Sequence, residues 1–224
     1  MNWTAFLLTL ELAVLTAVIL LAVGLPIAYW LTYSRQRWKV LVESVVALPL
    51  VLPPTVIGFY VLVAIGPHSP VGRWYTEVVG HPLPFTFEGL LIASVLYSLP
   101  FAVQPFASAF QQVDRRLVEM SWTLGVSKLG TFLKLIIPLS AAGIITGFVL
   151  SFAHTLGEFG VVLMVGGNIE GVTRTVSIEI YDEVQSLNYA VAGKTSALLL
   201  AISYLVLLGV YGLNRTMWAA WPQK

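Results

Sequence analysis

Long apolar segments alternate with shorter polar stretches along the whole chain. Each apolar segment holds about 20 residues or more, which is enough for a helix to cross the hydrocarbon core of a bilayer. The pattern predicts an all-α, polytopic membrane helix bundle that forms a single transmembrane domain over residues 1–224. The expected spans cover about residues 4–31, 40–65, 89–110, 139–165 and 194–214.

The second expected span is unusually rich in proline. Pro49, Pro53 and Pro54 lie within the sequence LPLVLPPTVIG. Proline lacks a backbone N–H, so each of these residues removes a helical hydrogen-bond donor. We therefore expect this span to be kinked or locally unwound.

The composition indicates an integral membrane protein. The 224 residues are 58% hydrophobic and 10% charged, whereas soluble domains are about half apolar and a quarter charged. A net charge of +1 without a Lys or Arg cluster gives no basis for nucleic-acid binding. The chain has no cysteine and its three histidines are scattered, so we expect neither a metal site nor a cofactor.

An intramembrane enzyme is one alternative that the sequence allows us to weigh. Ser94, Ser98 and Ser151 could act as nucleophiles, but no histidine lies at a useful sequence spacing from any of them. His154 and Glu158 likewise lack a nucleophile close by in the sequence. We therefore expect no catalytic residues.

The distribution of Lys and Arg predicts the orientation of the chain. Cytoplasmic loops of membrane proteins carry an excess of these residues. The pattern places the N-terminus outside, the C-terminus in the cytoplasm and the central polar loop in the cytoplasm. The cations expected inside are Arg35, Arg37, Lys39, Arg115, Arg116, Lys128, Lys134, Arg215 and Lys224, and those expected outside are Arg73, Arg174 and Lys194.

Residues 111–138, QQVDRRLVEMSWTLGVSKLGTFLKLIIP, form the central polar stretch. Asp114 is placed to cap a short helix, Gly125 to end it, and Ser127 to cap a second short helix. The second helix should end where Pro138 opens the next span. The first helix has an apolar stripe that needs a partner to cover it; its members are Leu117, Val118, Ser121, Trp122 and Leu124.

This stretch resembles the EAA loop of ABC-importer permeases. Glu119, Gly125 and Pro138 match the Glu, Gly and Pro of that motif at the same intervals, while Met120 and Ser121 replace its two alanines. The resemblance implies a cytoplasmic coupling loop that docks into a groove on a separate ATPase subunit. The residues expected to carry this coupling are Glu119, Ser121, Leu124, Gly125 and Pro138. An ordinary amphipathic loop is one alternative, and an ATP-independent channel or carrier, which has no need of docking helices, is another.

Two further segments resemble the molybdate permease family, an oxyanion branch of the binding-protein-dependent ABC importer permeases. They are LPLVLPPTVIGFYVLVAIG at residues 48–66 and HTLGEFGVVLMVGGNIEGVTRTVSIEIY at residues 154–181. The resemblance implies a permease for molybdate in the cell membrane of a bacterium or archaeon. Its implied partners are a second, identical permease copy, two cytoplasmic ATPase subunits, an extracytoplasmic molybdate-binding protein and membrane lipid. Tungstate, sulfate or thiosulfate is the alternative cargo.

The same resemblance implies the position of the translocation path and of the outer docking surface. The residues expected at the path or its gate are Pro53, Pro54, Thr55, Gly157, Glu158, Phe159 and Gly160. The residues expected to meet the binding protein are Arg73, Asn168 and Arg174.

Glu158 is an ionisable residue within the expected fourth span. His154 lies four residues earlier, so both side chains would share a helix face and could form a hydrogen-bonded pair. A carboxylate would repel a dianion, so we expect a structural or gating role rather than direct anion binding. The cores of the expected spans contain no Lys or Arg, which favours a weakly binding path fed by an external binding protein over a secondary transporter.

Overall fold

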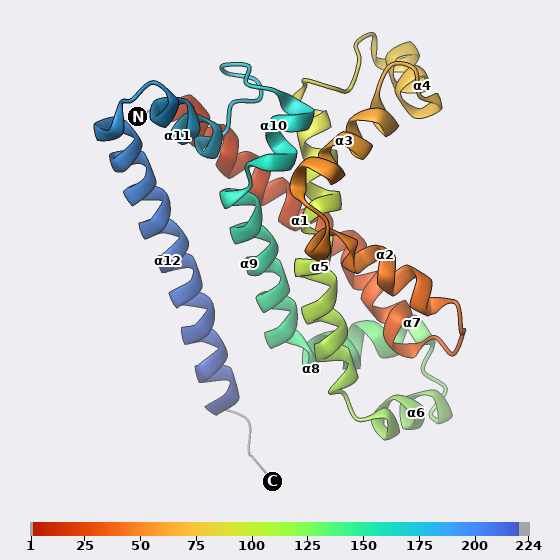
Figure 1. Ribbon diagram of the computed structural model, residues 1–224. Coiled ribbons are helices and arrows are strands. Elements are labelled where there is room, and N and C mark those ends of the chain that lie inside the picture. The colour runs from red at the N-terminus through yellow and green to blue at the C-terminus, as the bar shows by residue number, and fades with distance from the viewer. Residues whose placement is uncertain (1, 220–224) are drawn as a thin grey trace.

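The computed structural model describes the backbone of residues 2–219 and the side chains through Val210. Within this part the chain is helical and has no strand, which confirms the all-α prediction (Figure 1). Lys224 and the side chain of Arg215 lie outside the described residues. The elements are α1 (Trp3–Tyr33), α2 (Lys39–Val51), α3 (Pro54–Ile65), α4 (Pro70–Val79), α5 (Phe87–Gln111), α6 (Arg115–Thr123), α7 (Lys128–Thr131), the π-helical turn η1 (Phe132–Ile136), α8 (Ile137–Leu139), α9 (Ala141–Gly157), α10 (Gly160–Gly166), α11 (Val176–Gln185) and α12 (Tyr189–Ala219).

Helices α1, α5 and α9 form the centre of the bundle around Phe106. A Cβ atom added at Gly147 of α9 would lie 2.5 Å from the Phe106 ring, and one at Gly24 of α1 would lie 3.2 Å from it. Glycine at both positions therefore allows the two neighbouring helices to approach α5 closely. The buried side chains around this contact include Leu20, Ala28, Ala102, Val103, Phe110 and Ile136.

Three of the described helices are individually long and apolar enough to cross a membrane, namely α1, α5 and α12 through Val210. The number rises to five if each of two bent helix pairs forms one span. One pair is α3 with α4, bent by 59°, and the other is residues 128–139 with α9, bent by 78°. The division of the chain into five particular spans stays a prediction.

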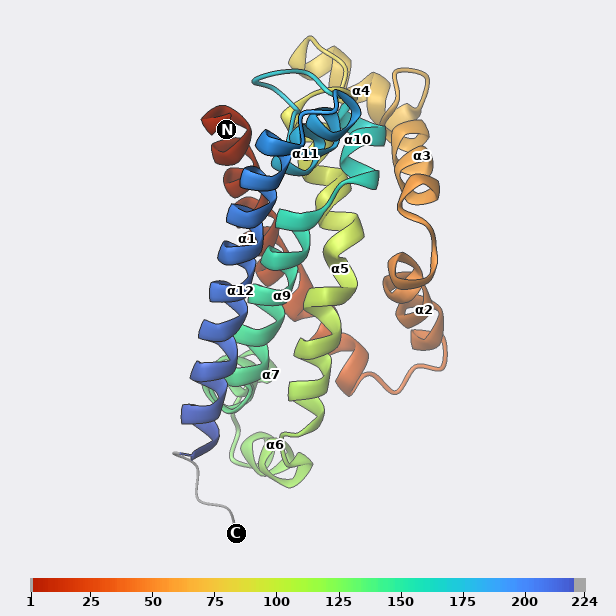
Figure 2. The ribbon, with the colours of Figure 1, turned by 60° about the vertical axis from the view of Figure 1, so that its left-hand side comes forward.

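The proline-rich second segment is broken, as its sequence predicts. Residues 40–65 divide into α2 and α3, with Leu52 and Pro53 between them in extended backbone conformation. Neither Pro53 nor Pro54 can donate a helical hydrogen bond, so the first helix cannot continue past this point. Figure 2 shows α2 and α3 one above the other on the same side of the bundle.

The fourth segment begins and ends at other residues than expected. Pro138 does not open the long helix; it lies in α8, and the chain turns at Ser140 before α9 begins. At the other end α9 stops at Gly157, because Glu158 has extended dihedral angles, with φ −69° and ψ 136°. The remaining residues of the expected span form the separate helix α10.

The polar connections gather at two opposite ends of the molecule. Helices α4, α10 and α11 lie at one end, whereas α6 and α7 lie at the other (Figures 1 and 2). Helix α1 begins at the first end and α12 runs from there to the second. The expected coupling loop and the expected docking residues are therefore on opposite sides of the bundle.

Candidate functional site: a coupling element, a broken-helix contact and an outer loop

The two short helices of the central loop form as their sequence predicts. Asp114 accepts a hydrogen bond from the Arg116 N–H at 2.8 Å and caps α6. Ser127 accepts one from the Gly130 N–H at 3.1 Å and caps α7. Between them Gly125 has a φ of +81°, the left-handed conformation that glycine adopts at low cost. We call residues 114–139 the coupling element, after the role that the sequence predicts for them.

The coupling element is anchored to the bundle by Val118 of α6. Val118 is 1% exposed and belongs to the same apolar cluster as Phe106. The Ser121 and Thr131 hydroxyls lie 2.9 Å apart and link α6 to α7, with Thr131 fully buried. Val118 therefore joins α6 to the core, and the contact of Ser121 with Thr131 joins α7 to α6.

The outer face of the coupling element is apolar and uncovered. Leu124 is 80% exposed and Leu129 is 67% exposed. Several exposed apolar side chains on one element are typical of an interaction site. Glu119 forms an exposed ion pair with Arg115 at 3.3 Å beside this face. The exposed apolar residues are Leu117, Met120, Trp122, Leu124, Val126, Leu129 and Leu133.

The structure brings together two of the residues expected at the path or gate. Gly160, the first residue of α10, packs on Pro54, the first residue of α3. A Cβ added at Gly160 would lie 2.6 Å from the Pro54 Cβ. One turn further along α3, a Cβ at Gly58 would lie 2.7 Å from the Met164 Cβ. Helices α3 and α10 are therefore in close contact where both of their parent segments are broken.

The other expected path residues surround this contact without forming one cluster. Pro53, just before α3, and Thr55 of α3 are both exposed. Gly157 is also exposed, and a Cβ added there would meet nothing within 4 Å. The Phe159 ring turns toward α11, with its centroid 5.0 Å from that of Tyr181.

The predicted His154–Glu158 pair is absent from the structure. Because Glu158 leaves the helix at the end of α9, four-residue helical spacing no longer applies to it. The His154 Nδ1 atom instead lies 3.0 Å from Ser98 Oγ of α5, and its ring stacks on Phe101 at 3.9 Å. Glu158 is 5% exposed, and neither of its carboxylate oxygens has a hydrogen-bond partner.

The contact between Ser98 and His154 corrects the expectation that no serine has a histidine within reach. The two residues are 56 positions apart, so sequence spacing could not reveal their contact. Ser98 is fully buried and also lies 3.1 Å from the Thr155 hydroxyl. Its burial leaves no room for a substrate carbonyl, and the pair therefore acts as an α5–α9 link.

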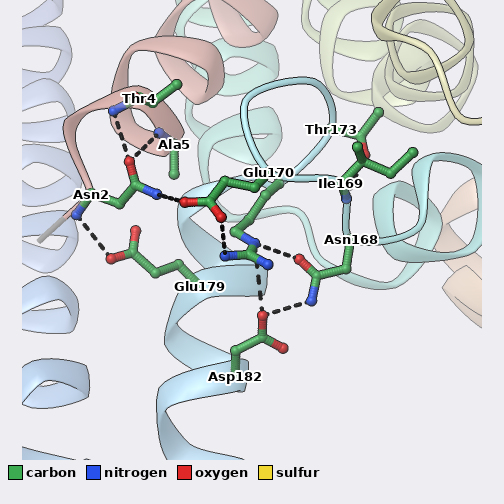
Figure 3. Close-up of polar contacts among 10 residues, drawn as sticks. Asn2, Thr4, Ala5, Asn168, Ile169, Glu170, Thr173, Glu179 and Asp182 are labelled. Carbon is green, nitrogen blue, oxygen red and sulfur yellow. Dashed lines mark hydrogen bonds and ion pairs between the residues drawn. The ribbon is translucent and has the colours of Figure 1, made fainter.

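Two of the three expected docking residues lie in one polar network in the loop between α10 and α11. Arg174 Nε donates to Asn168 Oδ1 at 2.6 Å. Asn168 Nδ2 in turn donates to Asp182 Oδ2 at 2.6 Å, a bond that Figure 3 marks between the two labelled residues. Arg174 also forms ion pairs with Glu170 at 3.7 Å and Asp182 at 3.9 Å. Arg73 is exposed on α4, on a different segment of the same end.

The same loop holds the start of the chain, a link that the sequence pattern did not reveal. The Asn2 backbone N–H donates to Glu179 Oε1 at 3.0 Å, and Asn2 Nδ2 lies 3.5 Å from Glu170 Oε1 (Figure 3). In addition, the Val176 N–H donates a buried hydrogen bond to Thr9 Oγ1 at 2.9 Å. These contacts join α1 to α11 across more than 160 residues of sequence.

The structure is thus a helical bundle with exposed apolar side chains on an element at one end and an ordered polar loop at the other. The chain matches the family described as binding-protein-dependent transport system inner membrane component over residues 21–215, and it belongs to that family. It is thus a multi-pass inner-membrane protein.

Individual relatives and a solved structure agree with this assignment. The chain is 52% identical over 209 residues to the molybdenum transport system permease protein of Azotobacter vinelandii, covering 93% of this chain and 92% of that one. Identity to the Escherichia coli K12 protein of the same description is 35% over 185 residues, covering 83% and 81%. The fold is similar to a chain of a bacterial ABC transporter involved in the import of the acidic polysaccharide alginate, with a TM-score of 0.76, 15% identity, and coverage of 95% of this chain and 78% of that one.

Proposed function

We propose that this chain is the membrane-spanning subunit of an ATP-driven importer for molybdate. The observation that carries this proposal is the 52% identity, over nearly the full length of both chains, to a molybdenum transport system permease protein. The uncovered apolar face of the coupling element supports the proposal that transport is driven by ATP, because a channel or carrier working alone has no need of such a face.

In this proposal ATP hydrolysis takes place on two separate cytoplasmic subunits. Each ATPase would cover the apolar face around Leu124 and Leu129, with Glu119 and Arg115 at its rim. Movement of the ATPase would then displace α6 and reach the core through buried Val118. A second, identical copy of the permease would complete the path, since cyclic dimers are the commonest oligomers.

The contact of Pro54 with Gly160 is the proposed gate. It joins the broken ends of two segments, and irregular backbone within a membrane is tolerated where it lines a cavity or is buried in protein. Pro53, Thr55, Gly157 and Phe159 would border this gate. The two helices could separate there without unfolding, because the helical hydrogen bonds are already interrupted on both sides.

The outer end of the bundle is the proposed docking surface for a molybdate-binding protein. Arg174 and Asn168 are held in position by Asp182 and Glu170, so this surface is ordered before the partner arrives. Arg73 on α4 would contribute a second contact. The orientation follows from these assignments, with the N-terminus outside and the coupling element in the cytoplasm.

A transport competition experiment tests the choice of cargo. The permease, its ATPase and its binding protein are reconstituted in proteoliposomes, and uptake of labelled molybdate is measured in the presence of tungstate, sulfate or thiosulfate. We expect competition by tungstate, which matches molybdate in charge, shape and size, and little by a hundredfold excess of thiosulfate or of the smaller sulfate ion. Preferential uptake of sulfate or thiosulfate would contradict the proposal and identify that anion as the cargo.

A further inference from the structure

Helix α5 exposes a row of polar side chains in its second half. Gln104, Ser108 and Gln111 are all exposed, and their spacing of four and three residues places them on one face of the helix. Each can donate a hydrogen bond, through an amide or a hydroxyl group. We call these three residues the α5 polar row.

A face of this kind is unsuited to lipid. Helix α12 provides the contrast, because the side chains that it exposes between residues 197 and 209 are almost entirely apolar. They are Ala197, Leu200, Ala201, Tyr204, Leu205 and Leu208. Polar side chains in membrane spans mostly face the bundle interior, a partner helix or water. The α5 polar row therefore requires an environment other than the one that surrounds α12.

Two adjoining hollows run along the α5 polar row. One has a volume of about 320 Å³ and lies between Leu50 of α2 and Leu150 of α9, with Gln104 and Ser108 in its wall. The other, of about 270 Å³, shares Gln104 and Ser108 and extends to Gln111, toward the end that holds the coupling element. Together they form a groove on one side of α5.

The walls of the groove carry no net fixed charge, since Lys39 and Glu43 have opposite signs. In the first hollow the lining residues are apolar except for Gln104 and Ser108. In the second, Lys39 and Glu43 of α2 are both present, so the cation and the carboxylate offset each other. The Lys39 ammonium also donates to the Leu31 carbonyl oxygen at 3.3 Å, which fixes it near the end of α1.

We propose that the α5 polar row lines the inner half of the translocation path and supplies hydrogen-bond donors to the passing oxyanion. Neutral donors suit this task, because they replace part of the anion's hydration without holding it as an Arg or Lys cluster would. The inference rests on the proposed function for the identity of the cargo. It adds Gln104 and Ser108 to a path whose expected residues all lie at the broken helices.

The position of the row is testable with single thiols, since the chain has no cysteine. Gln104→Cys and Ser108→Cys are compared with Leu205→Cys on α12, each in the complete complex in membranes. We expect a small hydrophilic methanethiosulfonate reagent to modify the two α5 variants at least tenfold faster than the α12 variant. Equal, slow modification of all three would overturn the proposal and indicate that a second copy of the chain covers the row.

The role of the donors is tested by transport. Gln104→Leu should lower the rate of molybdate uptake at least tenfold, Gln104→Glu should lower it further by repulsion, and Gln104→Asn should restore part of the rate. Gln185→Leu on α11, far from the groove, is the matched control and should leave uptake unchanged. Unchanged uptake with Gln104→Leu, in a complex that transports molybdate when unmodified, would contradict the inference. If the unmodified complex transports no molybdate, the proposed function fails instead, while the thiol experiment still decides the position of the row.

Discussion

Gly160 of α10 lies directly on Pro54 of α3, and a Cβ atom added to the glycine would come within 2.6 Å of the proline Cβ. The two residues are the first of their helices, and each follows a break in an apolar segment. The contact therefore joins two apolar segments where their helical hydrogen bonding is interrupted. The proposed gate depends on this contact.

A methyl group at this contact should impair the gate. Gly160→Ala forces α3 and α10 apart, and overpacking of this kind costs about 1–3 kcal/mol. We expect ATP-dependent uptake to fall about tenfold, which corresponds to about 1.4 kcal/mol. Gly209→Ala on α12 is the matched control, because nothing lies within 4 Å of a Cβ at that position. Equal uptake by the two variants would contradict the gate assignment.

The coupling element should tolerate only residues that accept a left-handed conformation at position 125. Gly125→Pro fixes φ near −65° and excludes the observed +81°. Uptake should then be lost while the protein remains in the membrane. Gly125→Asn is the control and should keep most of the activity, since asparagine adopts this conformation more readily than other residues and no atom lies within 4 Å.

Glu119→Lys tests the proposed contact with the ATPase independently of backbone geometry. It reverses the charge beside the exposed apolar face and breaks the ion pair with Arg115. We expect ATP hydrolysis to become uncoupled from uptake. If a purified complex with this change still couples hydrolysis to uptake at the unmodified rate, Glu119 is not part of the ATPase interface.

Removing the charge of Glu158 should have little effect. Its buried carboxylate has no hydrogen-bond partner, so Glu158→Gln breaks no bond and avoids the cost of burying a charge. We expect uptake within about threefold of the unmodified rate, a change that corresponds to less than about 1 kcal/mol. A loss beyond about tenfold, with normal assembly of the complex, would instead assign the Glu158 charge to the gate.

The orientation is tested by labelling single thiols. Ser127→Cys in the coupling element should react with an impermeant reagent only in inverted vesicles or broken cells. Ser69→Cys, which caps α4 at the opposite end, should react in intact cells. Labelling of the Ser127→Cys variant in intact cells would reverse the proposed topology.

The features that the sequence predicted well are those determined by neighbouring residues. The caps at Asp114 and Ser127 and the left-handed Gly125 follow from local backbone chemistry, and all three form as expected. The break before Pro54 is equally local, because proline lacks the donor that the helix needs.

The features that it missed depend on contacts between distant segments. The His154–Glu158 prediction assumed a continuous helix, and it is wrong because α9 ends at Gly157. The bond from Ser98 to His154 and the contact of Gly160 with Pro54 join different helices, so no periodicity within either helix could reveal them. The roles of the residues at the gate and at the docking surfaces stay predictions.

The most direct test of the account is the energy requirement of molybdate accumulation. Proteoliposomes that contain this chain and its ATPase are supplied with a loaded binding protein, and internal molybdate is measured with and without ATP. The account predicts accumulation above the external concentration only when ATP, the ATPase and the binding protein are all present. Equal accumulation without ATP, or by this chain alone, would contradict it and identify a channel or carrier that works independently.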